Sequence, residues 1–207
     1  MAISIYDLKP RFQNLLRPLV RGLAAAGVTA NQVTCLALAL SIALGLAIAL
    51  FAEHRPLFLL VPLWMFLRMA LNAIDGMLAR EFGQKSLLGA YLNELSDVIA
   101  DAALYLPFAL VAPFGPWSVG AVVWLAAVSE MAGALGPMVG APRRYDGPAG
   151  KSDRAFVFGA LGLYIGIAGT LPAGAFWIMP LMGLLMSWNI VNRVRGGIAE
   201  GKRNREH

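Results

Sequence analysis

The chain has 207 residues, of which 58% are hydrophobic and 14% are charged. This composition excludes an ordinary soluble domain and is typical of a protein that crosses a membrane several times. The net charge of +5 at pH 7 does not indicate a nucleic-acid partner, because the basic residues cluster in alternate connections between apolar runs. The single cysteine, Cys35, excludes an internal disulfide framework.

Residues 1–29 are expected to form an amphipathic helix that lies on the membrane surface. They lack the compact apolar core and the cleavage site of a signal peptide. A helix that packs on the protein without touching lipid is the alternative. Apolar residues recur there at roughly helical spacing, with basic residues among them: Tyr6, Leu8, Phe12, Leu15, Leu16, Leu19, Val20 and Leu23, with Lys9, Arg11, Arg17 and Arg21.

The rest of the chain alternates between apolar runs and short polar connections. We predict an all-α polytopic membrane protein with a single membrane domain over residues 1–207, a six-helix bundle over 31–192 and a basic tail over 193–207. Thr29 or Asn31 can cap the first span. The six predicted spans are about 31–52, 57–80, 87–112, 117–140, 155–171 and 174–192.

The distribution of charge predicts the orientation. Of the 17 Lys and Arg residues, fifteen fall in the N-terminal segment, the second-to-third connection, the fourth-to-fifth connection and the tail. Six spans place these segments on one side. The opposite connections contribute only Arg55, and Arg68 lies within a span. Because cytoplasmic loops carry an excess of Lys and Arg, both termini are predicted to be cytoplasmic.

One stretch combines carboxylates and carboxamides at helical spacing within apolar sequence. Asn72 and Asp75 are three residues apart and share a helix face, while Asn93, Asp97 and Asp101 are four apart and share a face of the next helix. Only a short polar turn, EFGQKS, separates the two helices, so they pack antiparallel and the two faces can converge. Buried polar groups of this kind are costly unless a metal or a partner balances them. The pattern predicts a divalent-metal site inside the membrane.

The same stretch resembles the CDP-alcohol phosphotransferase (CDP-alcohol phosphatidyltransferase) family. That family carries D-x-x-D-G-x-x-A-R, eight further residues, and then G-x-x-x-D-x-x-x-D. Six of the eight pattern positions are identical here, and two carry asparagine in place of aspartate. The matching positions are Asn72, Asp75, Gly76, Ala79, Arg80, Gly89, Asn93 and Asp97, of which Asn72 and Asn93 are the departures.

The resemblance implies transfer of a phosphoalcohol group from a CDP-alcohol, with CDP-diacylglycerol favoured, to an acceptor alcohol with release of CMP. It implies Mg²⁺ or Mn²⁺ as cofactor, a homodimer, membrane lipids as surroundings and a bacterial inner membrane as location. Asp97 is the implied base that activates the acceptor. The implied metal ligands are Asn72, Asp75, Asn93 and Asp97, and the implied nucleotide-binding residues are Asn31, Thr34, Asp75, Gly76, Ala79, Arg80 and Gly89.

The two asparagines remove two negative charges from the implied metal site. Such a site would hold two divalent ions less tightly, or hold only one. Glu94 and Asp101 are candidates to compensate. A catalytically degenerate member that binds nucleotide or acts as a scaffold is the alternative, and a small transporter is disfavoured because the sequence has no internal repeat.

Three further polar features are candidates for function. Arg68 lies one turn before Asn72 and can pair with a carboxylate or a phosphate, or form a purely structural ion pair. Glu130 is an intramembrane carboxylate. Lys151 and Arg154 lie in the polar loop 141–154, whose GKSDRA segment resembles a phosphate-holding loop of phosphatidylinositol-phosphate synthases. The alternative is that this loop only sets topology.

Finally, Ala132, Gly133 and Gly136 allow a neighbouring helix to approach closely and support the predicted homodimer.

Overall fold

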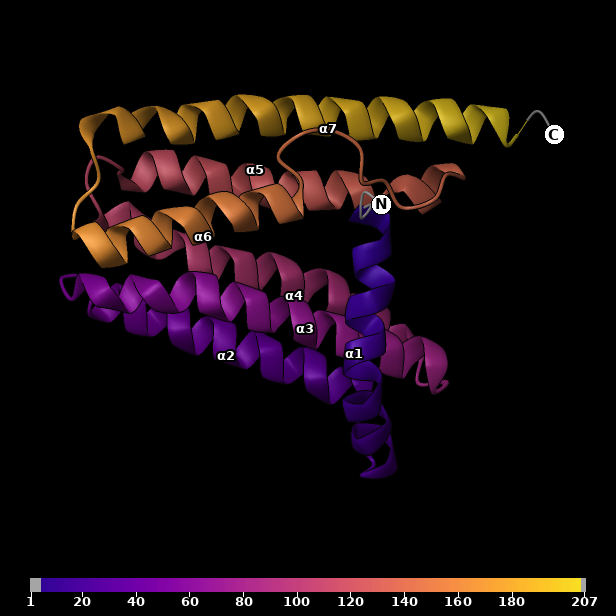
Figure 1. The fold of residues 1–207 in the computed structure, drawn as a ribbon. Helices are drawn as coiled ribbons and strands as arrows, with labels where there is room; N and C mark the ends of the chain where they lie inside the picture. Colours follow the sequence, from indigo (N-terminus) through magenta and orange to yellow (C-terminus); the bar gives the residue numbers. More distant parts are fainter. Residues whose placement is uncertain (1–4, 206–207) are drawn as a thin grey trace. The chain divides into compact units, whose positions relative to one another are not determined.

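The computed structural model describes residues 5–205 and is helical throughout its regular elements (Figure 1). Residues 1–4 and 206–207, and the side chains of residues 5–9, lie outside the described part. The predicted contributions of Tyr6, Leu8 and Lys9 to an amphipathic face therefore lie outside it too. Within the described residues the protein has seven α-helices and no strands, so the predicted all-α class is confirmed.

The seven α-helices correspond to the predicted amphipathic helix and the six apolar runs. Four short 3-10 helices connect some of them. The α-helices are α1 (Ile5–Ala25), α2 (Ala30–Leu50), α3 (Leu60–Glu81), α4 (Leu87–Tyr105), α5 (Pro116–Ala134), α6 (Lys151–Ala168) and α7 (Ile178–Arg203). The 3-10 helices are η1 (Arg55–Leu59), η2 (Leu106–Leu110), η3 (Gly136–Val139) and η4 (Ala173–Trp177).

Three helix ends differ from the expected ones. α4 stops at Tyr105 and α5 at Ala134, each followed by a 3-10 turn that contains a proline, Pro107 and Pro137. Proline cannot donate the backbone hydrogen bond that would continue an α-helix, so each apolar run outlasts its helix. In contrast, α7 continues to Arg203, well beyond the expected end at residue 192.

Four helical segments are long and apolar enough to cross a membrane by length and composition: Ala30–Leu50, Arg55–Glu81, Pro116–Ala134 and Ala173–Arg203. α4 and α6 are of similar length but each carries three charged residues, Glu94, Asp97 and Asp101 in α4 and Lys151, Asp153 and Arg154 in α6. These charged residues are therefore the reason that the two helices fall outside the apolar set, and the predicted count of six spans stays a prediction.

The chain divides into two compact units. Unit 1 contains the described residues up to Leu40 together with Trp64–Asp97, and unit 2 contains Ser41–Leu63 and the described residues from Val98 onward. α2, α3 and α4 each contribute to both units, because each of these helices contains one of the boundaries.

Unit 1 is built where α1 crosses the neighbouring helices at a steep angle (Figure 1). Val20 of α1 is fully buried against Val33 of α2 and against Ile74 and Leu78 of α3. Arg17 of α1 forms an ion pair with Glu81 at the end of α3, with 3.0 Å between Nη2 and Oε1. Other α1 leucines, Leu15 and Leu19, remain exposed. α1 therefore packs on the protein along one side and presents apolar side chains along another.

Unit 2 has an aromatic core. Tyr105 stacks on Phe158 with ring centroids 3.9 Å apart, and Phe108 meets Phe158 edge to face. α5 packs along α7, and α6 packs against η1. A side chain at Gly162 or Gly166 of α6 would strike the backbone or side chains of residues 58–62. Small residues thus permit close helix approach within this unit.

Gly133 of α5 and Gly136 of η3 also permit close packing inside the chain. A Cβ at Gly133 would lie 2.6 Å from the carbonyl oxygen of Arg144 and 3.0 Å from Nη1 of Arg193, and one at Gly136 would strike the backbone of Pro142. Both glycines are buried. Both glycines make room for the backbone of the loop that follows η3, rather than for a neighbouring helix as predicted, and because this loop belongs to their own chain they do not support a homodimer.

Candidate functional site

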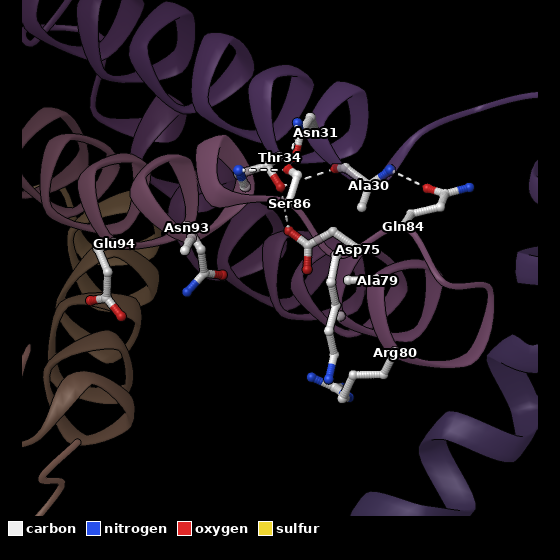
Figure 2. Close-up of a pocket in the computed structure, with 14 residues that line it drawn as sticks. Ala30, Asn31, Thr34, Asp75, Ala79, Arg80, Gln84, Ser86, Asn93 and Glu94 are labelled. Carbon is white, nitrogen blue, oxygen red and sulfur yellow. Dashed lines mark hydrogen bonds between the residues drawn. The ribbon is translucent and has the colours of Figure 1, made fainter. Parts of the chain in front are cut away.

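Unit 1 contains a cleft of about 500 Å³ between the start of α2, the C-terminal half of α3, the turn that follows it and the start of α4 (Figure 2). Each of these elements contributes polar side chains or small residues. The cleft is lined by Ala30, Asn31, Thr34, Asp75, Gly76, Ala79, Arg80, Gln84, Lys85, Ser86, Gly89, Ala90, Asn93 and Glu94.

All the residues predicted to bind nucleotide line this one cleft. Asn31 and Thr34 come from α2, Asp75 and Arg80 from α3, and Gly89 from α4, with Gly76 and Ala79 beside them. On α3, Asp75 lies one helical turn from Ala79 and Gly76 one turn from Arg80, and the short turn brings α4 back alongside them. The sequence pattern thus corresponds to a contiguous surface.

Asp75 is held at the bottom of the cleft by Thr34. The Thr34 hydroxyl donates to Oδ2 of Asp75 at 2.7 Å, and both residues are buried (Figure 2). α2 is fixed at its start by Thr29, whose Oγ1 accepts a hydrogen bond from the backbone of Gln32. This is the capping role predicted for Thr29. The cap sets where α2 begins and therefore where Asn31 and Thr34 point.

The two motif glycines leave room for neighbouring polar side chains. A Cβ at Gly76 would lie 2.8 Å from Nη2 of Arg80, and one at Gly89 would lie 2.8 Å from Oδ1 of Asn31 and 2.9 Å from Oγ of Ser86. Such contacts are closer than side chains tolerate. Glycine at these two positions therefore lets the side chains of Arg80, Asn31 and Ser86 lie where they do.

The turn between α3 and α4 supplies residues that the sequence analysis did not assign to the site. Gln84 accepts from the backbone nitrogen of Ala30 at 2.7 Å and donates to the carbonyl of Val28 at 3.3 Å. Ser86 accepts from Asn31 at 3.4 Å and from the backbone of Gly89 at 2.9 Å. The polarity of the turn EFGQKS could have indicated that Gln84 and Ser86 belong to the site. The sequence analysis used this turn only to separate two helices.

Two exposed cations also face the cleft. Arg80, predicted to hold a phosphate, and Lys85, predicted only as a loop residue, both line it and are exposed. A guanidinium and an ammonium group near helix backbone form a suitable environment for a diphosphate. The cleft therefore presents two positively charged groups to an anionic ligand.

The four predicted metal ligands separate into two pairs. Asp75 and Asn93 line the cleft from α3 and α4, whereas Asn72 and Asp97 do not line it. Nδ2 of Asn72 donates to Oδ1 of Asp97 at 3.4 Å, so this second pair is joined by its own hydrogen bond. Glu94, the neighbour of Asn93, lines the cleft as well.

The cleft offers oxygen donors of the kind that a hard cation takes. Among the described residues no three His, Cys, Asp or Glu side chains gather into a metal-binding cluster. However, Mg²⁺ in proteins is commonly held by one or two carboxylates together with substrate phosphates. The Asp75 carboxylate and the Asn93 carboxamide supply oxygen donors of this kind on two facing helices.

Arg68 forms an ion pair with Asp97. Of the two kinds of partner predicted for Arg68, a carboxylate or a phosphate, the structure therefore shows the carboxylate. Nη2 of Arg68 lies 3.1 Å from Oδ1 of Asp97 and 3.2 Å from the Asp97 carbonyl oxygen. The Arg68 side chain is only 8% exposed. The partner is a carboxylate of the motif itself, on the helix opposite.

The remaining predicted residues meet in unit 2. Glu130 of α5 accepts from Arg154 of α6 and Arg143 of the loop, each at 2.9 Å, and lies 3.5 Å from Arg193 of α7. Asp101 lies 3.5 Å from Arg154. Arg154 is fully buried, whereas Lys151, at the start of α6, is half-buried. The predicted phosphate-holding guanidinium thus lies between two carboxylates.

The chain is similar to known proteins over most of its length. The family model described as CDP-alcohol phosphatidyltransferase matches residues 27–191. The Inner membrane protein YnbA of Escherichia coli (strain K12) is 44% identical over 196 residues, which cover 93% of this chain and 96% of that protein. A protein of Aquifex aeolicus (strain VF5) described as uncharacterized is 34% identical over 108 residues, about half of each chain (52% and 51%). With a cleft formed by the residues of the family pattern and a match over most of its length, the chain belongs to the CDP-alcohol phosphatidyltransferase family.

Proposed function

We propose that the protein transfers a phosphatidyl group from CDP-diacylglycerol to an acceptor alcohol and releases CMP. The observation that carries the proposal is the cleft in unit 1, which gathers all the residues that the family resemblance assigns to the nucleotide. Arg80 and Lys85 bind the diphosphate, and Gly76 and Gly89 let the nucleotide approach the helix backbone. Asn31 and Thr34 border the same space.

Asp75 and Asn93 are the residues that would hold Mg²⁺ or Mn²⁺ in the cleft. The ion would neutralise negative charge that develops on the phosphates. Asn72 and Asp97, the other two predicted ligands, are hydrogen-bonded to each other outside the cleft.

Asp97 accepts the proton of the acceptor hydroxyl in the proposed reaction. The acceptor oxygen forms a bond to the phosphorus that carries the diacylglycerol, and the bond from that phosphorus to the CMP oxygen breaks. CMP leaves with the electron pair, and the proton remains on Asp97. Because Asp97 does not line the cleft, its role rests on the family pattern, while Arg68 and Asn72 orient its carboxylate.

The location and orientation of the protein in a membrane are inferred from its composition and from its Escherichia coli relative. We infer an integral protein of a bacterial inner membrane, with membrane lipids around it and both termini and the cleft on the cytoplasmic side. The name of the Escherichia coli relative and the asymmetry of Lys and Arg support this inference. A homodimer is inferred from the family resemblance alone, and a single monomeric mass in mild detergent at all concentrations would contradict it.

Lys151 and Arg154 are proposed to bind an anionic part of the acceptor. Because Arg154 is fully buried between carboxylates, Lys151 is the better position for a test. Lys151→Ala should raise the apparent KM for the acceptor more than the KM for CDP-diacylglycerol. Equal changes in both constants would indicate a structural or topological role instead.

The proposed activity is tested by CMP release from CDP-diacylglycerol by the purified protein, with Mg²⁺ or Mn²⁺ and a panel of alcohols. Glycerol phosphate, inositol phosphate, serine and a lipid alcohol cover the acceptor classes. Release that depends on one acceptor supports the proposal. Nucleotide binding without CMP release under any of these conditions would favour the alternative of a catalytically degenerate member. This alternative follows from the asparagines at positions 72 and 93, where the family pattern has aspartate.

A further inference from the structure

The charge of Asp97 is balanced by the protein itself. Arg68, with its side chain only 8% exposed, places Nη2 3.1 Å from Oδ1 of Asp97 and 3.2 Å from its carbonyl oxygen. Asn72, one turn along α3, donates to the same Oδ1 at 3.4 Å. A carboxylate whose one oxygen receives two donors from α3 is fixed without a metal ion.

Asn72 and Arg68 form a consistent arrangement around this carboxylate. An aspartate at position 72 would face Asp97 with the same charge, and Arg68 would then balance two carboxylates instead of one. The carboxamide instead donates a hydrogen bond. The replacement of Asp by Asn at this position therefore fits the presence of the buried guanidinium beside it.

The two sides of the motif differ in their charge. Asp75 and Asn93 line the cleft together with Glu94, whereas Asp97 is paired with a buried guanidinium outside the cleft. A divalent ion on Asp97 would lie next to the guanidinium of Arg68, and two cations that close repel strongly away from water. Only the Asp75 and Asn93 side of the motif can accept a divalent ion on these grounds.

We propose that Arg68 takes the place of a second divalent ion in this protein. The chain binds one Mg²⁺ or Mn²⁺, at Asp75 and Asn93, and Arg68 is a positioning residue that holds Asp97 and keeps metal away from it. The inference deepens the proposed function, on which it rests only for the choice of a cytidine nucleotide as companion ligand.

The first measurement counts ions directly. The purified full-length protein in detergent is titrated with Mn²⁺ in the presence of CDP, and bound ions are counted by equilibrium dialysis and by the electron paramagnetic resonance of Mn²⁺. We expect one ion per chain with the spectrum of an isolated Mn²⁺. Two ions per chain, or none, would overturn the proposal.

The second measurement changes the charge around Asp97 by substitution and counts the bound ions again. Asn72→Asp alone should still bind one ion, because Arg68 remains, whereas Arg68→Gln with Asn72→Asp should gain a second, spin-coupled ion. Arg17→Gln with Asn72→Asp is the matched control, since Arg17 is an ion-paired arginine of the same unit away from the motif. It should bind one ion. A second ion in this control, or its absence from the folded Arg68→Gln, Asn72→Asp protein, contradicts the role of Arg68.

These outcomes are separable from those of the activity assay. Two bound ions with intact CMP release overturn the inference and leave the proposed function standing. One bound ion without release from any donor keeps the inference and removes the proposed function. If Arg68→Gln with Asn72→Asp does not give a single peak in size-exclusion chromatography, the ion count of the unaltered protein decides.

Discussion

At the scale of single residues, the proposed chemistry depends on two carboxylates held by different partners. Thr34 holds Asp75, and Arg68 with Asn72 holds Asp97. Asp75→Asn should abolish CMP release because it removes a negative ligand from a charge-poor site, and Asp97→Asn should lower the rate by about 10²–10⁴-fold, as for loss of a general base. Asn72→Ala, which removes one neutral hydrogen bond, should cost about tenfold or less.

Initial rates of CMP release at saturating Mg²⁺ measure these effects, and size-exclusion profiles verify that each variant is folded. Full activity of Asp97→Asn, or activity of the unaltered protein without any divalent ion, would contradict the assigned roles and favour the degenerate-member alternative.

Gly89 gives a second test at this scale, because its effect is steric. Gly89→Ala would place a methyl group 2.8 Å from Oδ1 of Asn31 and 2.9 Å from Oγ of Ser86, so these side chains must shift into the cleft. We expect a several-fold rise in the KM for CDP-diacylglycerol with a smaller change in kcat. Gly22→Ala, in α1 with open space around it, is the control and should change neither constant.

The sequence was sufficient to predict which residues line the cleft of unit 1 but not the partner of Arg68. Helical spacing places Asp75 beside Ala79 and Gly76 beside Arg80, and a short turn must bring Gly89 back near them. In contrast, which carboxylate faces Arg68 depends on the register between α3 and α4, and spacing within one helix carries no information on that register. The roles of Gln84 and Ser86 were missed for the same reason, since both act across elements.

At the scale of secondary-structure elements, α1 is a packing element as well as a candidate surface helix. Val20 is fully buried against Ile74, Met77 and Leu78, whereas Leu19 is 53% exposed. Val20→Ala should lower the free energy of unfolding by about 1–3 kcal/mol, because it removes buried carbon atoms and leaves a small cavity. Leu19→Ala should have a much smaller effect on this quantity.

Thermal or denaturant unfolding in a fixed detergent compares the two variants of α1. Equal destabilisation would mean that α1 is held through its exposed side as well. The helical spacing of residues 12–23 predicted this helix, but apolar periodicity alone cannot separate a face that packs on protein from a face that contacts lipid. The burial of Val20 beside the exposure of Leu15 and Leu19 separates them.

Helix ends were the least predictable part of the elements. Apolar composition continues through Pro107 and Pro137, so hydropathy extended the predicted spans past the prolines that end the hydrogen-bonding pattern. The opposite error occurred in α7, where Arg193 and Arg195 suggested a tail. Arg193 is instead buried beside Glu130 and donates to the carbonyl of Ser129, so a pairing across helices keeps this basic segment helical and packed.

At the scale of the whole molecule, each of the two units contains a cluster of paired polar residues. Asp97 is paired in unit 1 and Asp101, one helical turn later on α4, is paired in unit 2. The sequence analysis placed both on one face and considered Asp101 a substitute for a missing metal ligand. Its contact with buried Arg154 assigns it to the ion-pair network of unit 2, which spacing along a single helix could not reveal.

The same network bears on the predicted orientation in the membrane. Arg154 and Arg193 are buried in ion pairs, so they are not loop charges that contact lipid headgroups. Without these two, thirteen of the fifteen basic residues assigned to the cytoplasmic side remain, against Arg55 on the other. The asymmetry is therefore strong enough to keep the predicted orientation, with residues 85 and 148 in the cytoplasm and residue 115 on the opposite side.

Cysteine labelling tests this orientation in cells. Because Cys35 is exposed, it is first replaced by serine, and Lys85→Cys, Gly115→Cys and Pro148→Cys are then made singly. A membrane-impermeant maleimide should label position 115 in spheroplasts and positions 85 and 148 only in inverted vesicles. Lys85 lines the cleft, so saturating CDP should also slow labelling at position 85 in inverted vesicles while leaving position 148 unchanged. Labelling of position 115 from the cytoplasmic side would overturn the topology, and protection of 148 equal to that of 85 would remove the link between orientation and the cleft.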